Sequence, residues 1–158
     1  MTSALTIAKS VSLTVGMLFA CLAVADSFKV TTTTSTDYEP GFRCAFWSRG
    51  HESSGDSVLQ ADDDSVPLPK ALIGINGTKH MLSSKAITWH RKKKDDLNIG
   101  DEMMLRFDDG VGVTVRAKVT WVCPREAEGC EITRYHAKIK VTFHGVTKTM
   151  VADGSCGS

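Results

Sequence analysis

The densest group of side chains able to bind a ligand is the charged run HRKKKDD at residues 90–96. Its cations could hold an anionic glycan, a lipid headgroup or an acidic protein. The alternative is a solvated loop, because the charges largely cancel within the run. No aromatic residues alternate with the cations, as they do where proteins bind single-stranded nucleic acid. The candidate binding residues of this run are His90, Arg91, Lys92, Lys93 and Lys94.

A second candidate for binding is the stretch Trp47, Ser48 and Arg49. An arginine beside an exposed aromatic ring is typical of residues that dominate a protein–protein interface. The alternative is that Trp47 packs beneath its own loop. If the chain has a contact surface, we expect it in loops 47–56 and 88–96.

The histidines and aspartates lack the spacing of a metal site. His136 and His144 share the outer face of one expected strand, but eight residues separate them, so they cannot ligate one ion together. A neighbouring strand would have to supply the second ligand, for example His80 or His90. Residues 62–64 are three aspartates in a row without the spaced ligands of a calcium loop, and they predict an acidic turn.

Motifs for covalent catalysis are also missing from the sequence. There is no G-x-S-x-G, and His51-Glu52 lacks the second histidine of H-E-x-x-H. The sequence therefore predicts no catalytic residue, no bound metal and no cofactor.

Four cysteines, Cys44, Cys123, Cys130 and Cys156, predict two disulfides if the domain is exported. Cys123 and Cys130 bracket a turn-rich loop between two patterned strands, so their bond would staple a hairpin. A bond between Cys44 and Cys156 would then join the first strand to the C-terminus. Metal binding is the rival interpretation, but the chain has no C-x-x-C pair and the spacing of Cys123 and Cys130 is not that of a zinc knuckle.

Residues 1–25 have the layout of a secretory signal peptide. Lys9 is their only charge, an apolar run spans residues 11–24, and Ala-Val-Ala precedes Asp26 as a cleavage site. We therefore expect a periplasmic or secreted protein. The apolar run is too short and too interrupted for a transmembrane span.

An alternative to simple cleavage is a lipid anchor at Cys21. Residues 18–21 (LFAC) resemble a poor bacterial lipobox, in which the cysteine becomes the lipidated N-terminus. The two alternatives lead to a soluble protein or to a protein tethered in the envelope.

Length and charge limit the remaining chain to one domain of balanced charge. Removing 25 of the 158 residues leaves 133, which suits a single domain. The leader holds one of the 19 basic residues and none of the 18 acidic ones, so the rest is formally neutral. A neutral domain has no general attraction to nucleic acid, and we expect no such partner.

Alternating apolar and polar residues predict antiparallel strands with one wet face. The clearest examples are residues 113–123, with Trp121 and Cys123 expected on the inner face, and residues 135–143. Asn76-Gly77 predicts a tight hairpin turn. We expect a Ser/Thr-rich linker, or a loose first strand, over 26–41 and one small antiparallel barrel or sandwich over 42–158. It should have seven to nine strands and be stapled by disulfides.

Residues 46–52 (FWSRGHE) resemble the F-W-S-K-G-D-E stretch of bacterial membrane-bound C-type lysozyme inhibitors. These are small exported β-barrels, and in that family the lysine of the stretch reaches into the lysozyme cleft. The resemblance implies that Arg49 would pair there with catalytic carboxylates. The chain departs from the family in carrying the stretch after its first cysteine and in lacking the tyrosine of S-G-x-x-Y after Ser54-Gly55. The ending GSCG resembles small uncharacterised exported bacterial proteins, which implies no activity.

These observations favour an exported, non-catalytic β-domain that binds a protein or a cell-envelope glycan, with inhibition of an enzyme as one form of binding. An envelope structural or stress protein without a discrete ligand is the second hypothesis. A small hydrolase or a metal carrier is the third.

Overall fold

The computed structural model describes residues 27–34, 42–51, 55–62, 69–93, 96–124, 127 and 129–157. In this part of the chain every regular element is a β-strand, and no helix is long and apolar enough to cross a membrane. The expected signal peptide and Cys21 lie outside the described residues. The strands are β1 (Val30–Thr31), β2 (Cys44–Ser48), β3 (Leu59–Ala61), β4 (Lys70–Ile75), β5 (Thr78–His90), β6 (Glu102–Asp108), β7 (Val111–Val122), β8 (Ile132–Phe143) and β9 (Val146–Gly157).

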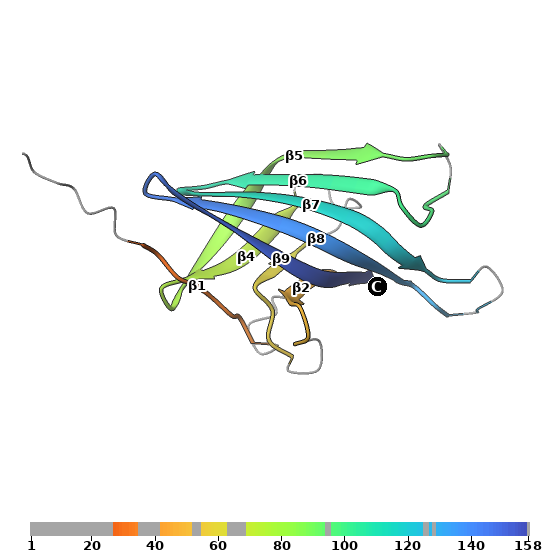
Figure 1. Cartoon of the computed structure of the whole chain (residues 1–158), viewed down its shortest axis with the longest axis horizontal. Helices are drawn as coiled ribbons and strands as arrows, with labels where there is room; N and C mark the ends of the chain where they lie inside the picture. The colour runs from red at the N-terminus through yellow and green to blue at the C-terminus, as the bar shows by residue number, and fades with distance from the viewer. Residues whose placement is uncertain are drawn as a thin grey trace, which may run out of the picture.

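Strands β2 to β9 form a closed meander. Each strand pairs antiparallel with the next, and β9 pairs back onto β2, while the short β1 pairs with β4 (Figure 1). This confirms the predicted all-β barrel. Closure gives all eight barrel strands a neighbour on both sides, so the barrel has no free edge.

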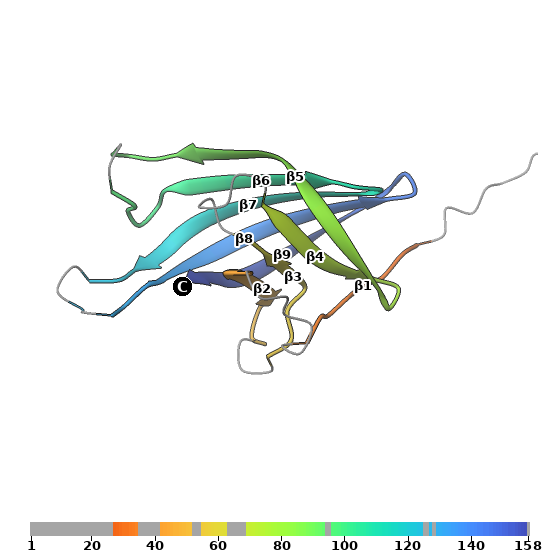
Figure 2. The same ribbon diagram turned by 180° about the vertical axis from the view of Figure 1, so that it is seen from behind.

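The barrel has two distinct ends. The turns that join β4 to β5 and β8 to β9 lie at one end, and the C-terminal end of β9 lies at the other (Figures 1 and 2). We call the first the turn end. We call the second the disulfide end, because Cys44 and Cys156 are register partners on β2 and β9 and are bonded there.

Both disulfides that the cysteine spacing predicted are present. The Cys44–Cys156 bond crosses the seam between the first and last barrel strands, with Cα atoms 4.0 Å apart. The Cys123–Cys130 bond staples the β7–β8 connection, with Cα atoms 5.7 Å apart. The second bond lies beside the β8 backbone, since Ile132 N donates to Cys123 Sγ at 3.2 Å.

The turn residues adopt the backbone conformation that their types favour. Asn76 and Gly77 have φ values of 52° and 82°, which are the positive angles of the predicted tight hairpin turn. His144 and Gly145 make an equivalent turn between β8 and β9, with φ values of 47° and 78°. These turns set the register of the strands that they join.

The inner face of the barrel is a packed apolar core. In β6, β7 and β8 alternate residues are buried, as the sequence pattern predicts. An eight-stranded barrel is just wide enough for its own side chains to fill it. The largest side chains that are less than 2% exposed include Phe46, Leu59, Ile73, Leu82, Leu105 and Ile139.

Residues 27–34, expected from the sequence to be a linker or a loose first strand, pack against the barrel, and Val30–Thr31 form the short strand β1. Phe28 is 2% exposed, and it packs edge-on against Phe143 with ring centroids 5.8 Å apart. Lys29 exchanges hydrogen bonds with Asn76 in the β4–β5 turn. The folded domain therefore begins before Phe42, and its N-terminal segment covers the turn end.

The same segment buries the outer face of β3 and β4. Gln60 is fully buried there and donates to Thr33 Oγ1 at 3.0 Å. Gly74 permits the close approach of β1, because a Cβ atom on it would meet Thr31 Oγ1 at 2.5 Å. These contacts explain why both faces of β3 and β4 are buried.

Two details of the strand pattern were predicted wrongly. A register irregularity between Val119 and Trp121 turns Trp121 outward, where it is 37% exposed, and Cys123 also lies outside the core. One extra residue in a strand reverses the faces of all that follow. The loop expected over 88–96 begins later, because β5 continues to His90 past a second irregularity between Ser84 and Ala86.

Candidate functional site

Besides Arg134, which lies over the Trp121 ring, the outer face of β6, β7 and β8 carries five exposed cations. Strand geometry places them there, since alternate residues of each strand point away from the core. We call this set the cationic face. Its members are Arg106, Arg116, Lys118, Lys138 and Lys140.

Strand register gathers these cations into adjacent rows. Arg116 on β7 is the direct partner of Lys138 on β8. In the next row Thr114 lies between Arg106 on β6 and Lys140 on β8. Successive outward residues of a strand are about 7 Å apart, so these two rows lie about that distance from each other. Like charges in directly opposite positions destabilise a sheet, and this arrangement therefore has a cost in stability.

No described carboxylate lies within ion-pairing distance of these five side chains. Glu102 is the register partner of Lys118, but the two do not form an ion pair. On this wall of the barrel a hydrogen bond joins His136 Nδ1 and Asp153 Oδ1, which are 2.8 Å apart. The cationic face therefore carries an excess of positive charge on a nearly neutral chain, with Glu102 opposite Lys118 and Asp108 exposed on β6.

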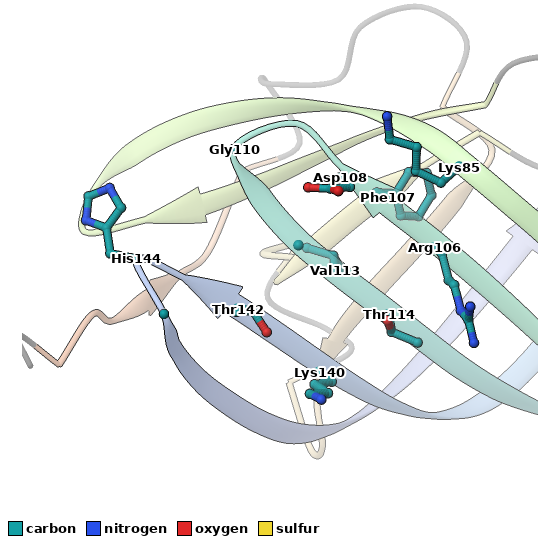
Figure 3. Close-up of a pocket in the computed structure, with 12 residues that line it drawn as sticks. Lys85, Arg106, Phe107, Asp108, Gly110, Val113, Thr114, Lys140, Thr142 and His144 are labelled. Atoms are coloured by element: carbon teal, nitrogen blue, oxygen red, sulfur yellow. The ribbon is translucent and has the colours of Figure 1, made fainter.

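Two adjoining surface hollows lie on the cationic face. Their volumes are about 550 and 610 Å³, and both are lined by Arg106, Thr114 and Lys140. In the first, Thr114 and Thr142 lie between Arg106, Lys140 and His144 (Figure 3). Arg116 and Lys138 line the second. We call the two together the cationic groove.

The chemistry of the groove is that of anion binding. Lysine, arginine and threonine side chains donate hydrogen bonds to carboxylate, phosphate or sulfate oxygens. Phe107 lines one hollow but is 2% exposed, so it offers no ring face on which a nucleic-acid base could stack. These properties suit an anionic ligand whose charges repeat along its length.

The predicted binding run at residues 90–94 does not form one surface. His90 ends β5 on the outer face, and Arg91 stacks over the Trp89 ring at 4.8 Å. Lys92 and Lys93 together line a separate hollow with Ile99. Lys94 lies outside the described residues.

Lys92 and Asp101 give the loop after β5 its shape. Asp101 is fully buried and accepts from Lys92 N at 2.9 Å and from Asn98 N at 2.8 Å. The hydrogen bond from Lys92 N lowers the pKa of Asp101 from its ordinary value, helped by Asn98 N and the charges of Lys92 and Arg91, although burial opposes the shift. Lys92 Nζ also donates to Ile99 O at 3.1 Å. Lys92 therefore has a structural role.

The other predicted stretch ends β2. Trp47 is half-buried and is the register partner of Asp153 on β9. Ser48 and Arg49 are exposed, and His51 N donates to Ser48 O at 3.0 Å to close the turn. Strands β3 and β4 separate β2 from β5 on one side of the ring, and β6 to β9 separate them on the other. The structure therefore does not unite the two predicted sites.

The other polar residues singled out by the sequence have structural partners. His144 stacks on Phe143 with ring centroids 3.9 Å apart, while His136 pairs with Asp153. Asp62 Oδ2 accepts from Lys70 N at 2.8 Å, and Asp63 and Asp64 lie outside the described residues. Within the part of the chain that the structure describes, no three His, Cys, Asp or Glu side chains gather in a way that could hold a metal.

The sequence contains a signal for the cationic face that a search for charge runs misses. Basic residues occupy alternate positions on two consecutive strands, at 116 and 118 and again at 138 and 140. Alternation alone predicts that each pair points outward. The hairpin register, which the pattern does not specify, is what brings Arg116 opposite Lys138.

Comparison with protein-family models, with curated proteins and with solved structures found no match to this chain.

Proposed function

We propose that this chain is a non-catalytic binding domain that holds an acidic glycan of the extracytoplasmic space in its cationic groove. The observation that carries the proposal is the set of adjacent cation rows without described carboxylate partners, around Arg106, Arg116, Lys138 and Lys140. A polymer with repeating carboxylate or phosphate groups would neutralise several rows at once, and release of its counterions would favour binding.

A glycan suits the groove better than a protein partner does. Protein interfaces depend on buried aromatic and large apolar anchors near their centre. Among the four cations that line the groove, the outward positions carry threonines and the half-buried Met104, while Glu102, Asp108 and His136 lie at the ends of the face. Polar hydroxyl donors beside cations fit the hydroxyl and carboxylate groups of an acidic sugar.

The direct test is binding of polygalacturonate, with neutral dextran as the control polymer, at low and at high salt. We expect binding of polygalacturonate alone, and weaker binding as salt screens the charges. The Arg106→Gln/Lys140→Gln variant should bind about 30-fold more weakly, since each cation contributes about 1 kcal/mol near an anionic surface. A variant with the same loss of charge elsewhere, Lys29→Gln/Lys70→Gln, should bind normally. Equal losses in both variants would contradict a localised site.

A second candidate function is inhibition of a C-type lysozyme through Arg49. The exposed position of Arg49 on the turn after β2 favours it, because the side chain could enter a cleft. Purified protein should then inhibit a C-type lysozyme, and Arg49→Ala should abolish the inhibition while Lys70→Ala does not. An absence of inhibition by the unaltered chain would remove this candidate.

We infer that the chain acts outside the cytoplasm, in the periplasm or after secretion. The leader pattern of residues 1–25 supports export, and two disulfides are typical of an oxidising compartment. The intact mass of unreduced protein from its native host tests this inference. A mass that begins at Asp26 indicates a free domain, and one that begins at an acylated Cys21 indicates a lipid-anchored protein. A mass that retains the leader would overturn the inference.

A further inference from the structure

A second concave site, separate from the cationic groove, lies at the disulfide end of the barrel. It has a volume of about 220 Å³ and draws its lining from β2, β5, β6, β8, β9 and the loop after β5. We call it the mouth pocket. The lining residues that matter for its chemistry are Arg43, Trp89, Arg91, Leu97, Met103 and Tyr135.

The floor of the mouth pocket is apolar and firmly supported. Met103 and Tyr135 are 3% and 4% exposed and belong to the barrel core. Trp89 and Leu97 pack against the same core. Since the barrel interior beneath them is filled, the pocket ends at this floor. An apolar group of a ligand in contact with this floor would be shielded from water on that side.

Two arginines and one glutamate supply the charged lining. Arg91 is held over the Trp89 ring at 4.8 Å. Arg43 directly precedes the seam cysteine Cys44, and its carbonyl accepts from Gly157 N at 2.9 Å. Glu131 is the acidic residue in the described lining. A guanidinium has five N–H donors, so an arginine that already has one partner can still hold a carboxylate.

The wall formed by the loop after β5 is organised before any ligand arrives. The buried Asp101 carboxylate fixes both Lys92 N and Asn98 N, which flank the positions of Arg91 and Leu97. The seam disulfide fixes the opposite wall, where Cys44 and Cys156 also line the pocket. A site that needs little ordering loses less free energy when it binds.

We propose that the mouth pocket binds one carboxylate group carried on a small apolar body, with Arg43 and Arg91 as the anion partners. Its volume equals that of about seven waters, which excludes drug-sized ligands and suits a single ring or side chain. The same chemistry occurs in a free small carboxylic acid and in an acidic side chain of a partner protein. The proposal does not depend on the function assigned to the cationic groove.

The test uses NMR and calorimetry on the full mature chain with three small probes. Benzoate represents a free acid, and N-acetylglutamic acid α-amide represents an acidic side chain. Benzamide is the neutral analogue of benzoate. We expect at least one of the acids to bind with a Kd on the order of 1 mM and to shift the Trp89 indole signal. The tighter acid identifies the source of the ligand, and benzamide should bind about 10-fold more weakly or not at all.

Matched variants distinguish the mouth pocket from the groove. Arg43→Gln/Arg91→Gln should weaken binding of the acid about 10-fold or more and leave polygalacturonate binding unchanged. Arg106→Gln/Lys140→Gln should do the reverse. If the mouth variant unfolds, Arg43→Lys/Arg91→Lys replaces it, and this variant should retain charge attraction but lose bidentate geometry.

Three results would overturn the proposal. One is equal binding of benzoate and benzamide, and another is unchanged acid binding by the folded mouth variants. The third is the absence of a Trp89 shift with both acids up to concentrations on the order of 10 mM.

Discussion

The two ends of the barrel are closed by different kinds of interaction. At the turn end, the chain's own N-terminal segment packs Phe28 into the core against Phe143, and Lys148 Nζ donates to the Phe28 carbonyl. At the disulfide end, a covalent bond and a hydrogen-bonded loop surround a pocket. The Phe28 side chain fills the space at the turn end. At the disulfide end, the disulfide and the polar loop leave hydrogen-bond donors that can face a ligand.

The same comparison explains why the arginines gather where they do. Arg43 and Arg91 lie at the disulfide end, beside an apolar floor that is already held in place. At the turn end, the hydrogen bonds of Lys29 and Asn76 are made within the chain. Four experiments test this contrast between the two ends of the barrel.

Removal of the Cys44–Cys156 disulfide should lower the stability of the protein more than removal of the Cys123–Cys130 disulfide. The Cys44–Cys156 bond spans 112 residues and the Cys123–Cys130 bond spans seven. In the chain-entropy model, loss of the first bond lowers the free energy of unfolding by about 5 kcal/mol and loss of the second by about 2.5 kcal/mol. Denaturant unfolding of Cys44→Ala/Cys156→Ala and Cys123→Ala/Cys130→Ala measures both. Equal destabilisation would show that loop closure does not govern the effect.

Truncation of the Phe28 side chain should cause the next largest loss of stability. Phe28 is 2% exposed, so Phe28→Ala should lower the free energy of unfolding by about 3 kcal/mol or more through the cavity left behind. Val151→Ala is the matched surface control, since Val151 is 48% exposed and its change should stay within about 0.5 kcal/mol. Thermal unfolding at neutral pH measures both variants.

A second variant tests whether the whole N-terminal segment contributes. Gly74→Ala places a Cβ atom 2.5 Å from Thr31 Oγ1 and should displace β1 from β4. If both Phe28→Ala and Gly74→Ala unfold like the unaltered chain, residues 27–34 do not stabilise the barrel.

Acid should loosen the disulfide end before it affects the turn end. Because the pKa of Asp101 is lower in the folded state, its stabilising contribution is present above the unfolded pKa of about 3.9 and is lost as pH falls through the folded value. We expect the amide signals of Lys92 and Asn98 to move together below about pH 4. In Asp101→Asn both signals should be displaced at neutral pH and should lack this titration. Titration of the Asn76 amide in the same range would contradict a local effect.

The smallest change in stability is expected from a substitution on the cationic face, which lies between the two ends of the barrel. Arg116 and Lys138 are like charges in directly opposite positions, so Arg116→Gln should raise the free energy of unfolding by about 0.5 kcal/mol at low salt. High salt should remove the gain because it screens the repulsion. Lys70→Gln on β4 is the control, and it should change stability little. A loss of stability in Arg116→Gln would show that the cationic face is compensated.

Local residue types were enough to predict much of the fold. Asn76-Gly77 predicted its turn because these residues tolerate positive φ, and residues 135–141 predicted an inward face because strand side chains alternate. The alternation failed at Trp121, where a register irregularity carries no residue-type signal. The sequence left residues 26–41 open between a linker and a loose first strand, because Thr-rich residues 31–34 have no core pattern of their own and are ordered by contacts with β3 and β4.

The sequence alone was enough to predict an all-β chain, the outward direction of its alternate cations and the Cys123–Cys130 pair, because strand periodicity and loop spacing are local properties. The Cys44–Cys156 pair followed only as the two cysteines that remained. The tertiary structure alone decided which cations share a surface. It placed Arg91 over the Trp89 ring, apart from the hollow that Lys92 and Lys93 share. It gathered Arg106, Arg116, Lys138 and Lys140 from three strands. The physical reason is that charge at a surface depends on strand register and ring closure, which bring distant residues within a few ångströms and turn adjacent ones to opposite faces.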